Sequence, residues 1–183
     1  MTRIDHLQIG FIGAGRLAKA LARLCSIRGL SVSAIGSRSA VHAKELAALL
    51  SGCVSMSAQH VADTCDLIFI TTPDHAIKAT ADSITWRPGT FVVHCSGATE
   101  VEALHKAATD GAFIGGFHPL QSFADPDAAI QSLSGCTITV EARESRLNET
   151  LVTIAELLDC KVNRLPRGLA LFIMLPLDML RSL

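Results

Sequence analysis

The sequence is poor in net charge, in cysteine motifs and in long uninterrupted apolar runs. Its 16 Lys and Arg residues against 17 Asp and Glu residues leave a formal net charge of −1. The basic residues are scattered, so nucleic acid is not an expected partner. Residues 1–6 contain no apolar core long enough for a signal peptide, which predicts a cytoplasmic protein. No internal repeat or low-complexity tract is present.

The cysteines lack the spacing of a metal or redox motif. No two of them form a C-x-x-C pattern, and most lie within apolar, strand-like segments; they are Cys25, Cys53, Cys65, Cys95, Cys136 and Cys160. Buried, reduced thiols are therefore the expected state, with zinc ligands or disulfides as the alternatives.

The length and hydropathy suit one domain with a short appendage. A chain of 183 residues accommodates one α/β domain of ordinary size. Hydrophobic residues make up 49% of the chain and its mean hydropathy is +0.39, both high for a small soluble domain. These values indicate that something covers part of the apolar surface.

The most informative stretch runs from Leu7 to Ala18. An apolar run ends there at Gly13-Ala14-Gly15 and a helical pattern begins at once, which is the strand–turn–helix order of the dinucleotide-binding fingerprint. Gly13 permits the sharp turn, Gly15 lets a pyrophosphate approach the backbone, and Ala18 keeps the helix close to the strand. The amide end of the helix then holds the phosphates. A glycine turn in a domain that binds nothing is the alternative.

Apolar segments alternate with helical patterns along the rest of the chain. This alternation predicts an α/β fold with a doubly wound, mostly parallel sheet and right-handed crossovers. The expected strands are the run before Gly13, Ser31–Gly36, Cys53–Ser55, Asp66–Thr71, Thr90–His94, Ala112–Phe117, Thr137–Glu141 and Lys161–Leu165. The first expected helix follows the glycine turn and ends near Arg28. A brief helical turn capped by Ser57 is also expected, and the other expected helices are Ala40–Leu50, Asp74–Ile84, Glu100–Thr109 and Arg143–Leu158.

The end of the second expected strand reads Gly36-Ser37-Arg38-Ser39. A site that prefers NAD places Asp or Glu here, on the ribose hydroxyls. This chain instead offers a guanidinium flanked by two hydroxyls, a set that receives a phosphate, and so favours NADP over NAD. The missing acid also argues against an S-adenosylmethionine methyltransferase. A solvated Arg38 that caps the next helix is the alternative.

Further polar residues follow the fourth and fifth expected strands, where ligands of open α/β sheets bind. Thr71-Thr72-Pro73-Asp74 is expected to line the cofactor, with Asp74 more typical of a helix N-cap than of a direct contact. The Ser96 hydroxyl and the backbone around Gly97 are expected to face the nicotinamide and a substrate oxygen. A turn in which Ser96 is satisfied locally is the alternative.

His118 lies at the carboxyl end of the sixth expected strand and is followed by Pro119. A neutral imidazole beside the nicotinamide can take or give the proton that accompanies hydride transfer. A loop histidine bonded to the backbone is the alternative. Five other histidines fall on expected helices or termini and are expected at the surface: His6, His42, His60, His75 and His105.

These motifs together resemble a known group of proteins. The strings are Gly-Phe-Ile-Gly-Ala-Gly-Arg-Leu, Thr-Thr-Pro-Asp, His-Cys-Ser-Gly-Ala and Phe-His-Pro-Leu-Gln-Ser-Phe. They are similar to the Rossmann-like proteins of the pyrroline-5-carboxylate reductase and 6-phosphogluconate dehydrogenase superfamily. Within it, the chain most resembles a subgroup known only as NADP-dependent oxidoreductases. The resemblance covers roughly Leu7 to Leu165.

The resemblance implies an NADP site at Gly13, Gly15, Ser37 and Arg38. It extends to prephenate dehydrogenases, in which a His-Pro in this loop serves the substrate hydroxyl; that role carries over only to His118 and Pro119. The substrate is not implied.

The resemblance also implies a division of the chain. Residues 1–165 form an NAD(P)-binding Rossmann domain, and residues 166–183 form a short apolar tail where an all-helical domain is expected. Pro176, Asp178 and Arg181 interrupt this tail, so it does not span a bilayer and no membrane is expected as a partner. Its codons in another frame can spell a segment similar to the opening helix of that domain. We therefore expect a frameshift near Pro166–Leu169, with an authentic tail packed on the sheet edge as the alternative. An exposed apolar tail favours self-association, for instance as a homodimer.

Two functions are consistent with these features. One is an NADP-dependent oxidoreductase that transfers hydride to or from a small carbonyl, imine or hydroxy substrate. The other is a module that binds NADP(H) without catalysis, because the wall of its substrate site is missing. The expected catalytic residues are His118 and Ser96. The expected cofactor-binding residues are Gly13, Ala14, Gly15, Arg16, Leu17, Ser37, Arg38, Ser39, Thr71, Thr72, Pro73, Ser96 and Gly97, and no metal site is expected.

Overall fold

Strands and helices alternate from β1 to β6, as the pattern predicts. The computed structural model describes residues 4, 6–120 and 133–164. The strands are β1 (Ile9–Ile12), β2 (Val32–Gly36), β3 (Val54–Met56), β4 (Leu67–Ile70), β5 (Phe91–His94), β6 (Phe113–Pro119), β7 (Thr137–Ala142) and β8 (Lys161–Arg164). The helices are α1 (Arg16–Ile27), α2 (Ala40–Ala48), α3 (Ala58–Thr64), α4 (Asp74–Asp82), the 3₁₀ helix η1 (Val101–Leu104), α5 (His105–Thr109) and α7 (Ser145–Leu157).

The strands of the described residues form one sheet in the order β3-β2-β1-β4-β5-β6-β7-β8. Neighbouring strands are parallel except β6 and β7, which are antiparallel. The first six strands have the order of the Rossmann fold, with the switch of direction between β1 and β4. The expected doubly wound, mostly parallel α/β fold is confirmed. The antiparallel β7 was not expected, because alternating apolar segments carry no information on strand direction.

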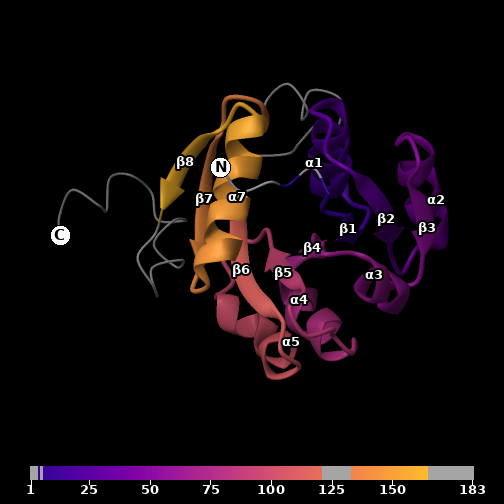
Figure 1. Cartoon of the computed structure of the whole chain (residues 1–183). Coiled ribbons are helices and arrows are strands. Elements are labelled where there is room, and N and C mark those ends of the chain that lie inside the picture. The colour runs from indigo at the N-terminus through magenta and orange to yellow at the C-terminus, as the bar shows by residue number, and fades with distance from the viewer. Residues whose placement is uncertain (1–3, 5, 121–132, 165–183) are drawn as a thin grey trace.

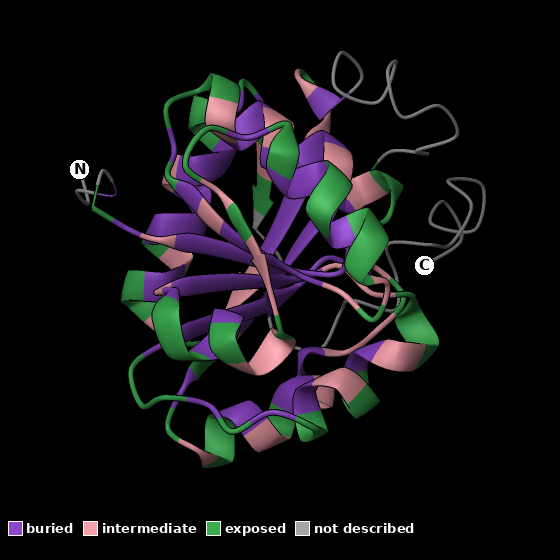
Figure 2. Cartoon of the chain, turned by 90° about the vertical axis from the view of Figure 1, so that its right-hand side faces the viewer, coloured by how far each residue is buried: buried purple, intermediate pink, exposed green. Residues whose placement is uncertain are grey.

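Helices cover both faces of the sheet (Figure 1). Residues of α1, α2 and α7 pack on one face, and residues of α3, α4, η1 and α5 pack on the other. Figure 2 shows the strands buried at the centre and the exposed residues on the outer sides of the helices. On the first face the rings of Phe11 and Phe69 stack at a centroid distance of 5.2 Å, and Phe117 meets Phe69 edge-on at 5.4 Å. This ladder of rings ties together β1, β4 and β6, two of which, β1 and β4, end at the switch point.

Several element ends differ from the expectation, and two of the differences affect the site. β6 continues through His118 and Pro119, so His118 belongs to a strand and not to the loop after it. Pro73 is the N-cap of α4, and Asp74 is its first residue with no side-chain capping bond, so the expectation that Asp74 caps this helix was wrong. Glu100–Thr109 is a 3₁₀ turn followed by a short α-helix instead of one helix.

The cysteines are free thiols in this structure, four of them buried and two half-buried. Within the described ranges, no helix is long and apolar enough to cross a membrane. The expected tail of residues 166–183 and the string Gln121–Phe123 lie outside the described residues.

Candidate functional site

The turn between β1 and α1 depends on Gly13. Its φ of +122° is in the region that favours glycine, and a Cβ at this position would lie 2.6 Å from Thr71 Oγ1 and 2.7 Å from the Thr71 carbonyl carbon. The Gly13 N–H donates to the Gly36 carbonyl at 2.8 Å. Thr71 Oγ1 donates in turn to the carbonyls of Ile12 and Gly13, both at 3.3 Å. The ends of β1, β2 and β4 are therefore held together around this turn.

Gly15 has a different role from Gly13. Its backbone is ordinary extended chain, with φ −78° and ψ −171°, and a Cβ built on it meets no atom within 4 Å. Neither the fold nor the neighbouring side chains therefore require glycine at position 15. Gly15 is the N-cap of α1, which has no side-chain cap and no acidic residue in its first turn. The amide end of α1 thus faces open space, and the missing side chain leaves room for a ligand to approach it.

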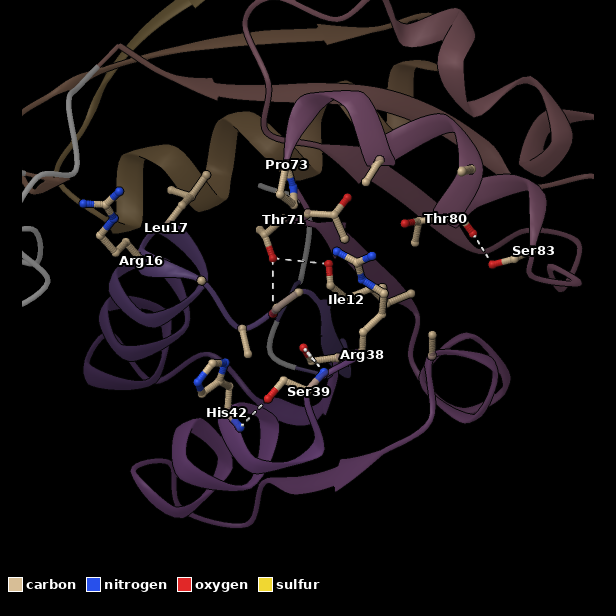
Figure 3. A pocket seen from close by; sticks show the side chains of 18 residues that line it. Ile12, Arg16, Leu17, Arg38, Ser39, His42, Thr71, Pro73, Thr80 and Ser83 are labelled. Carbon is tan, nitrogen blue, oxygen red and sulfur yellow. Dashed lines mark hydrogen bonds between the residues drawn. The ribbon is translucent and has the colours of Figure 1, made fainter.

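The end of β2 supplies a cation to the same space. Arg38 is exposed, and Figure 3 shows its side chain extending from the end of β2 into the pocket. Ser37 Oγ accepts from the N–H of Ser39 at 3.2 Å, and Ser39 Oγ accepts from the N–H of His42 at 3.4 Å, so Ser39 caps α2. His42, expected only as a surface residue, also lines the pocket. His42 follows the capping residue Ser39 by three positions, and this spacing is the sequence signal from which its place at the pocket could have been predicted.

The loop after β4 and the start of α4 form the opposite wall. Thr71, Thr72 and Pro73 line the pocket together with residues of α4, including the small side chains of Ala76 and Ala79. The Thr72 hydroxyl oxygen is buried and makes no hydrogen bond. A buried hydroxyl without a partner is costly, so a ligand that bonds to Thr72 would remove this cost.

These walls enclose one cavity of about 1180 Å³. It brings together eleven of the predicted residues, which are Gly13, Ala14, Gly15, Arg16, Leu17, Ser37, Arg38, Ser39, Thr71, Thr72 and Pro73. None of the described residues that line it is Asp or Glu, whereas Arg16, Arg38 and His42 are among them. The charge and the open helix end both favour an anionic ligand. Ser96, Gly97 and His118 do not line this cavity.

Ser96 is engaged within its own turn. Its hydroxyl lies 2.9 Å from Thr99 Oγ1 and accepts from the N–H of Ala98 at 3.2 Å. The N–H of Ser96 donates to Nδ1 of His94 at 3.3 Å. These contacts are those of a locally satisfied serine, the alternative considered for this residue. They also fix the ring of His94, because its Nδ1 accepts a hydrogen bond and a neutral ring then carries its proton on Nε2.

His94 and His118 form a buried pair beside the pocket. Their ring centroids are 5.2 Å apart with a tilt of 46°, and the two residues are 0% and 1% exposed. His94 pairs with Ile70 of β4 on one side and with Gly116 of β6 on the other. Both rings therefore lie at the carboxyl ends of strands, next to the loop that carries Thr72. The sequence reasoning missed His94, although it stands at a strand end as His118 does.

Glycine makes room for this pair. A Cβ on Gly116 would lie 2.1 Å from Nε2 of His118, so the ring occupies the space above residue 116. Both ring nitrogens of His118, and Nε2 of His94, are buried without a hydrogen-bond partner. Thr139, which pairs with His118 across β6 and β7, has a buried hydroxyl that also makes no hydrogen bond. Such a group of unpaired polar atoms is typical of a site that contacts a ligand.

Burial keeps both imidazoles neutral. Desolvation lowers the pKa of His94 to about 4. Desolvation is also the main cause that lowers the pKa of His118 to about 3, and repulsion by the charge that His94 carries when protonated is the second cause. A neutral imidazole still donates one N–H hydrogen bond and accepts another. No group of three or more His, Cys, Asp or Glu side chains that could hold a metal ion occurs among the described residues.

Comparisons with known proteins agree with this geometry. Residues 8–97 match the model of a family described as NADP oxidoreductase, coenzyme F420-dependent, which is just under half of the chain. No curated protein sequence matches the chain.

Several solved structures have the same fold. An NADP oxidoreductase from Bacteroides fragilis superposes with a TM-score of 0.78 at 22% identity, over 98% of this chain and 70% of its own. A reductive aminase from Aspergillus terreus, solved with NADPH and ethyl-5-oxohexanoate, gives 0.70 at 15% identity, over 96% and 61%. Prephenate dehydrogenase from Aquifex aeolicus gives 0.69 at 13% identity, over 92% and 63%. The chain thus spans about three fifths of the length of the last two proteins.

The buried histidines predict a loss of stability in acid. Below pH 6.5 these histidines become protonated in the unfolded chain but stay neutral in the folded chain. The free energy of unfolding therefore falls by up to about 1.4 kcal/mol per pH unit for each histidine. For both residues together this loss extends from about pH 6.5 to pH 4, where His94 begins to titrate in the folded state. Urea denaturation at a series of pH values measures it. His118→Gln should reduce the slope, whereas the exposed His105→Gln should not; equal slopes in the two variants contradict the assignment.

The two glycines of the turn should respond differently to alanine. Gly13→Ala adds a Cβ that meets Thr71 at 2.6 Å on a backbone with positive φ, so we expect a loss of at least about 2 kcal/mol in the free energy of unfolding. Gly15→Ala meets nothing and should cost no more than about 1 kcal/mol, the usual effect at an N-cap. Urea denaturation at neutral pH distinguishes them. Equal losses would mean that Gly15 is also required by the fold.

Proposed function

We propose that this chain binds NADP(H) in the cavity at the ends of β1, β2 and β4. The observation that carries the proposal is the open space at Gly15, because a glycine that the fold does not need stands where an uncapped helix end meets the cavity. The pyrophosphate of a dinucleotide suits this position, since the amide groups and the helix dipole favour an anion there. The size of the cavity, about 1180 Å³, suits a large ligand.

Arg38 supports NADP over NAD. It lies at the end of β2, where an acidic residue would contact the ribose hydroxyls of NAD. The guanidinium, with Ser37 and Ser39 beside it, suits the additional phosphate of NADP. The family matched by residues 8–97 is described as NADP oxidoreductase, and the Aspergillus reductive aminase was solved with NADPH.

The reaction we propose is hydride transfer to or from a small carbonyl, imine or hydroxy substrate. Bound NADPH supplies the hydride. The loop of Thr72 follows β4, which pairs with β5, and β5 pairs in turn with β6. This order supports an arrangement in which the nicotinamide points from the cavity toward His94 and His118. His118 donates a neutral N–H hydrogen bond to the reacting oxygen or nitrogen of the substrate. Ser96 holds the turn that fixes His94.

This assignment is consistent with the superfamily of pyrroline-5-carboxylate reductase and 6-phosphogluconate dehydrogenase that the motifs resemble. A second candidate is a module that binds NADP(H) without catalysis. The observation that favours it is that neither of the expected catalytic residues, His118 and Ser96, lines the cavity. Turnover of NADPH with a panel of imines and 2-oxo acids separates the two functions.

The affinity for nucleotides tests the cofactor assignment. Arg38→Ala should raise the dissociation constant of NADPH about ten-fold or more, because a charge-assisted contact with the phosphate is lost. The dissociation constant of NADH should remain nearly unchanged. Gly15→Ala is the matched control, since its methyl group obstructs the pyrophosphate that both nucleotides share and should weaken both alike. NADPH and NADH fluorescence titrations measure the two affinities. Equal weakening of both nucleotides by Arg38→Ala contradicts the phosphate contact.

The role of His118 is tested on the rate. His118→Gln should lower hydride transfer by about 100-fold, the usual effect of losing a proton-transferring or polarising group, with the dissociation constant of NADPH unchanged. Single-turnover oxidation of NADPH by the best substrate of the panel measures the rate. His105→Gln, an exposed histidine of α5, serves as the control. An unaltered rate in His118→Gln removes the residue from the mechanism.

A further inference from the structure

Two thiols meet at the far end of the sheet from the cavity. Cys136 immediately precedes β7 and Cys160 immediately precedes β8, and their sulfur atoms are 4.0 Å apart. Cys136 is half-buried, whereas Cys160 is 8% exposed. In Figure 1 these strands lie at the opposite side of the molecule from β2 and β3.

The backbone holds the two residues in register. Thr137 of β7 pairs with Lys161 of β8 in a parallel ladder, and the Lys161 N–H donates to the Cys136 carbonyl at 2.9 Å. Cys136 and Cys160 stand one step before this pair. Neighbouring strands are about 4.8 Å apart, which is within the Cα separation that a disulfide spans. The sulfur atoms therefore need a rotation of side chains, not a movement of strands, to bond.

The two thiols are not equivalent. The Cys160 thiol is a hydrogen-bond partner of Cys136 and lowers the pKa of that residue, while the same contact and burial raise the pKa of Cys160. In the neutral pair the Cys136 thiol donates to Cys160 Sγ at 4.0 Å, and the Cys160 thiol donates to the Leu133 carbonyl at 3.1 Å, which holds its sulfur beside Cys136. Cys136 is also the more exposed of the two residues, so it is the thiol that an incoming electrophile reaches first. The thiolate is the form that reacts with electrophiles.

The other cysteines lack this combination. Cys25, Cys65 and Cys95 are buried, and desolvation raises the pKa of all three. Cys53 is half-buried like Cys136, but desolvation raises its pKa to about 11. Among the described residues, Cys53 is thus the matched thiol of similar exposure without the activating neighbour.

We propose that Cys136 and Cys160 are a peroxide-reactive dithiol, in which Cys136 is the nucleophile and Cys160 the resolving thiol. The Cys136 thiolate attacks one oxygen of a peroxide, the O–O bond breaks, and a sulfenic acid forms while the other oxygen leaves and takes a proton as alcohol or water. Cys160 then attacks the Cys136 sulfur. The S–O bond breaks, the S–S bond forms, and the hydroxyl group leaves as water with the Cys160 proton. The peroxide gains the two electrons that the thiols lose.

The product ties the start of β8 to the start of β7. It forms next to the end of β6, because the N–H of Leu120 donates to the Thr137 carbonyl at 2.8 Å. The nucleotide cavity lies on β1, β2 and β4 and contains neither cysteine. Oxidation should therefore leave the dissociation constant of NADPH, or of any ligand of that cavity, unchanged.

Hydrogen peroxide added to the reduced chain of 183 residues tests the proposal. We expect a mass decrease of two hydrogen atoms, one disulfide-linked peptide pair containing Cys136 and Cys160, and recovery of both thiols with dithiothreitol. Cys136 should be consumed about ten-fold faster than Cys53, as its thiolate character requires. Cys160→Ser should stop at a sulfenic acid on Cys136 that dimedone traps, and Cys53→Ser should behave as the unaltered chain.

The peptide map of the unaltered chain decides the outcome even if a serine variant fails to fold. A disulfide between any other two cysteines, or consumption of Cys136 no faster than of Cys53, overturns the proposal. Trapping of the sulfenic acid on Cys160 instead of Cys136 reverses the roles and overturns the assignment of the nucleophile.

Discussion

The site depends on one close backbone contact, between the turn at Gly13 and the loop at Thr71. No side chain fits between them, since a Cβ on Gly13 would lie 2.6 Å from Thr71 Oγ1. This contact lets the chain pass from β1 into α1 without an intervening loop. The amide end of α1 therefore opens at the carboxyl edge of the sheet, directly between the ends of β2 and β4. Arg38 and Thr72 face the same cavity for this reason.

The cavity and the pair of His94 and His118 beside it, the two halves of the candidate site, differ in charge. The cavity has cations in its lining and no carboxylate among its described residues, so it attracts an anion. The histidine pair beside it is neutral, because burial lowers the pKa of both rings. A phosphate-bearing ligand is thus favoured at one end, and an uncharged polar group is favoured at the other. The boundary between the halves is the loop of Thr72, at the step from β4 to β5.

The fold and the lining of the cavity were predictable because they depend on local patterns. A glycine turn between an apolar run and a helix has few structural solutions, and eleven of the predicted residues line one cavity. The half that contains His94, Ser96 and His118 was harder to predict from the sequence. His118 was expected at the carboxyl end of a strand, and β6 extends through it, but its contact with His94 was not foreseen. The local bonds of Ser96 follow from a turn that no spacing reveals. His94 acquires its environment from β4 and β6, which are distant in the sequence.

The sequence by itself determined the α/β alternation, the glycine turn and the basic residue after the second strand, since each is encoded within a dozen neighbouring residues. Only the tertiary structure decided which strand ends meet, and with them the pairing of His94 with His118 and of Cys136 with Cys160. It also decided the direction of β7. These features depend on contacts between segments far apart in the chain, where burial and register, and not local propensity, set the distances and the charges.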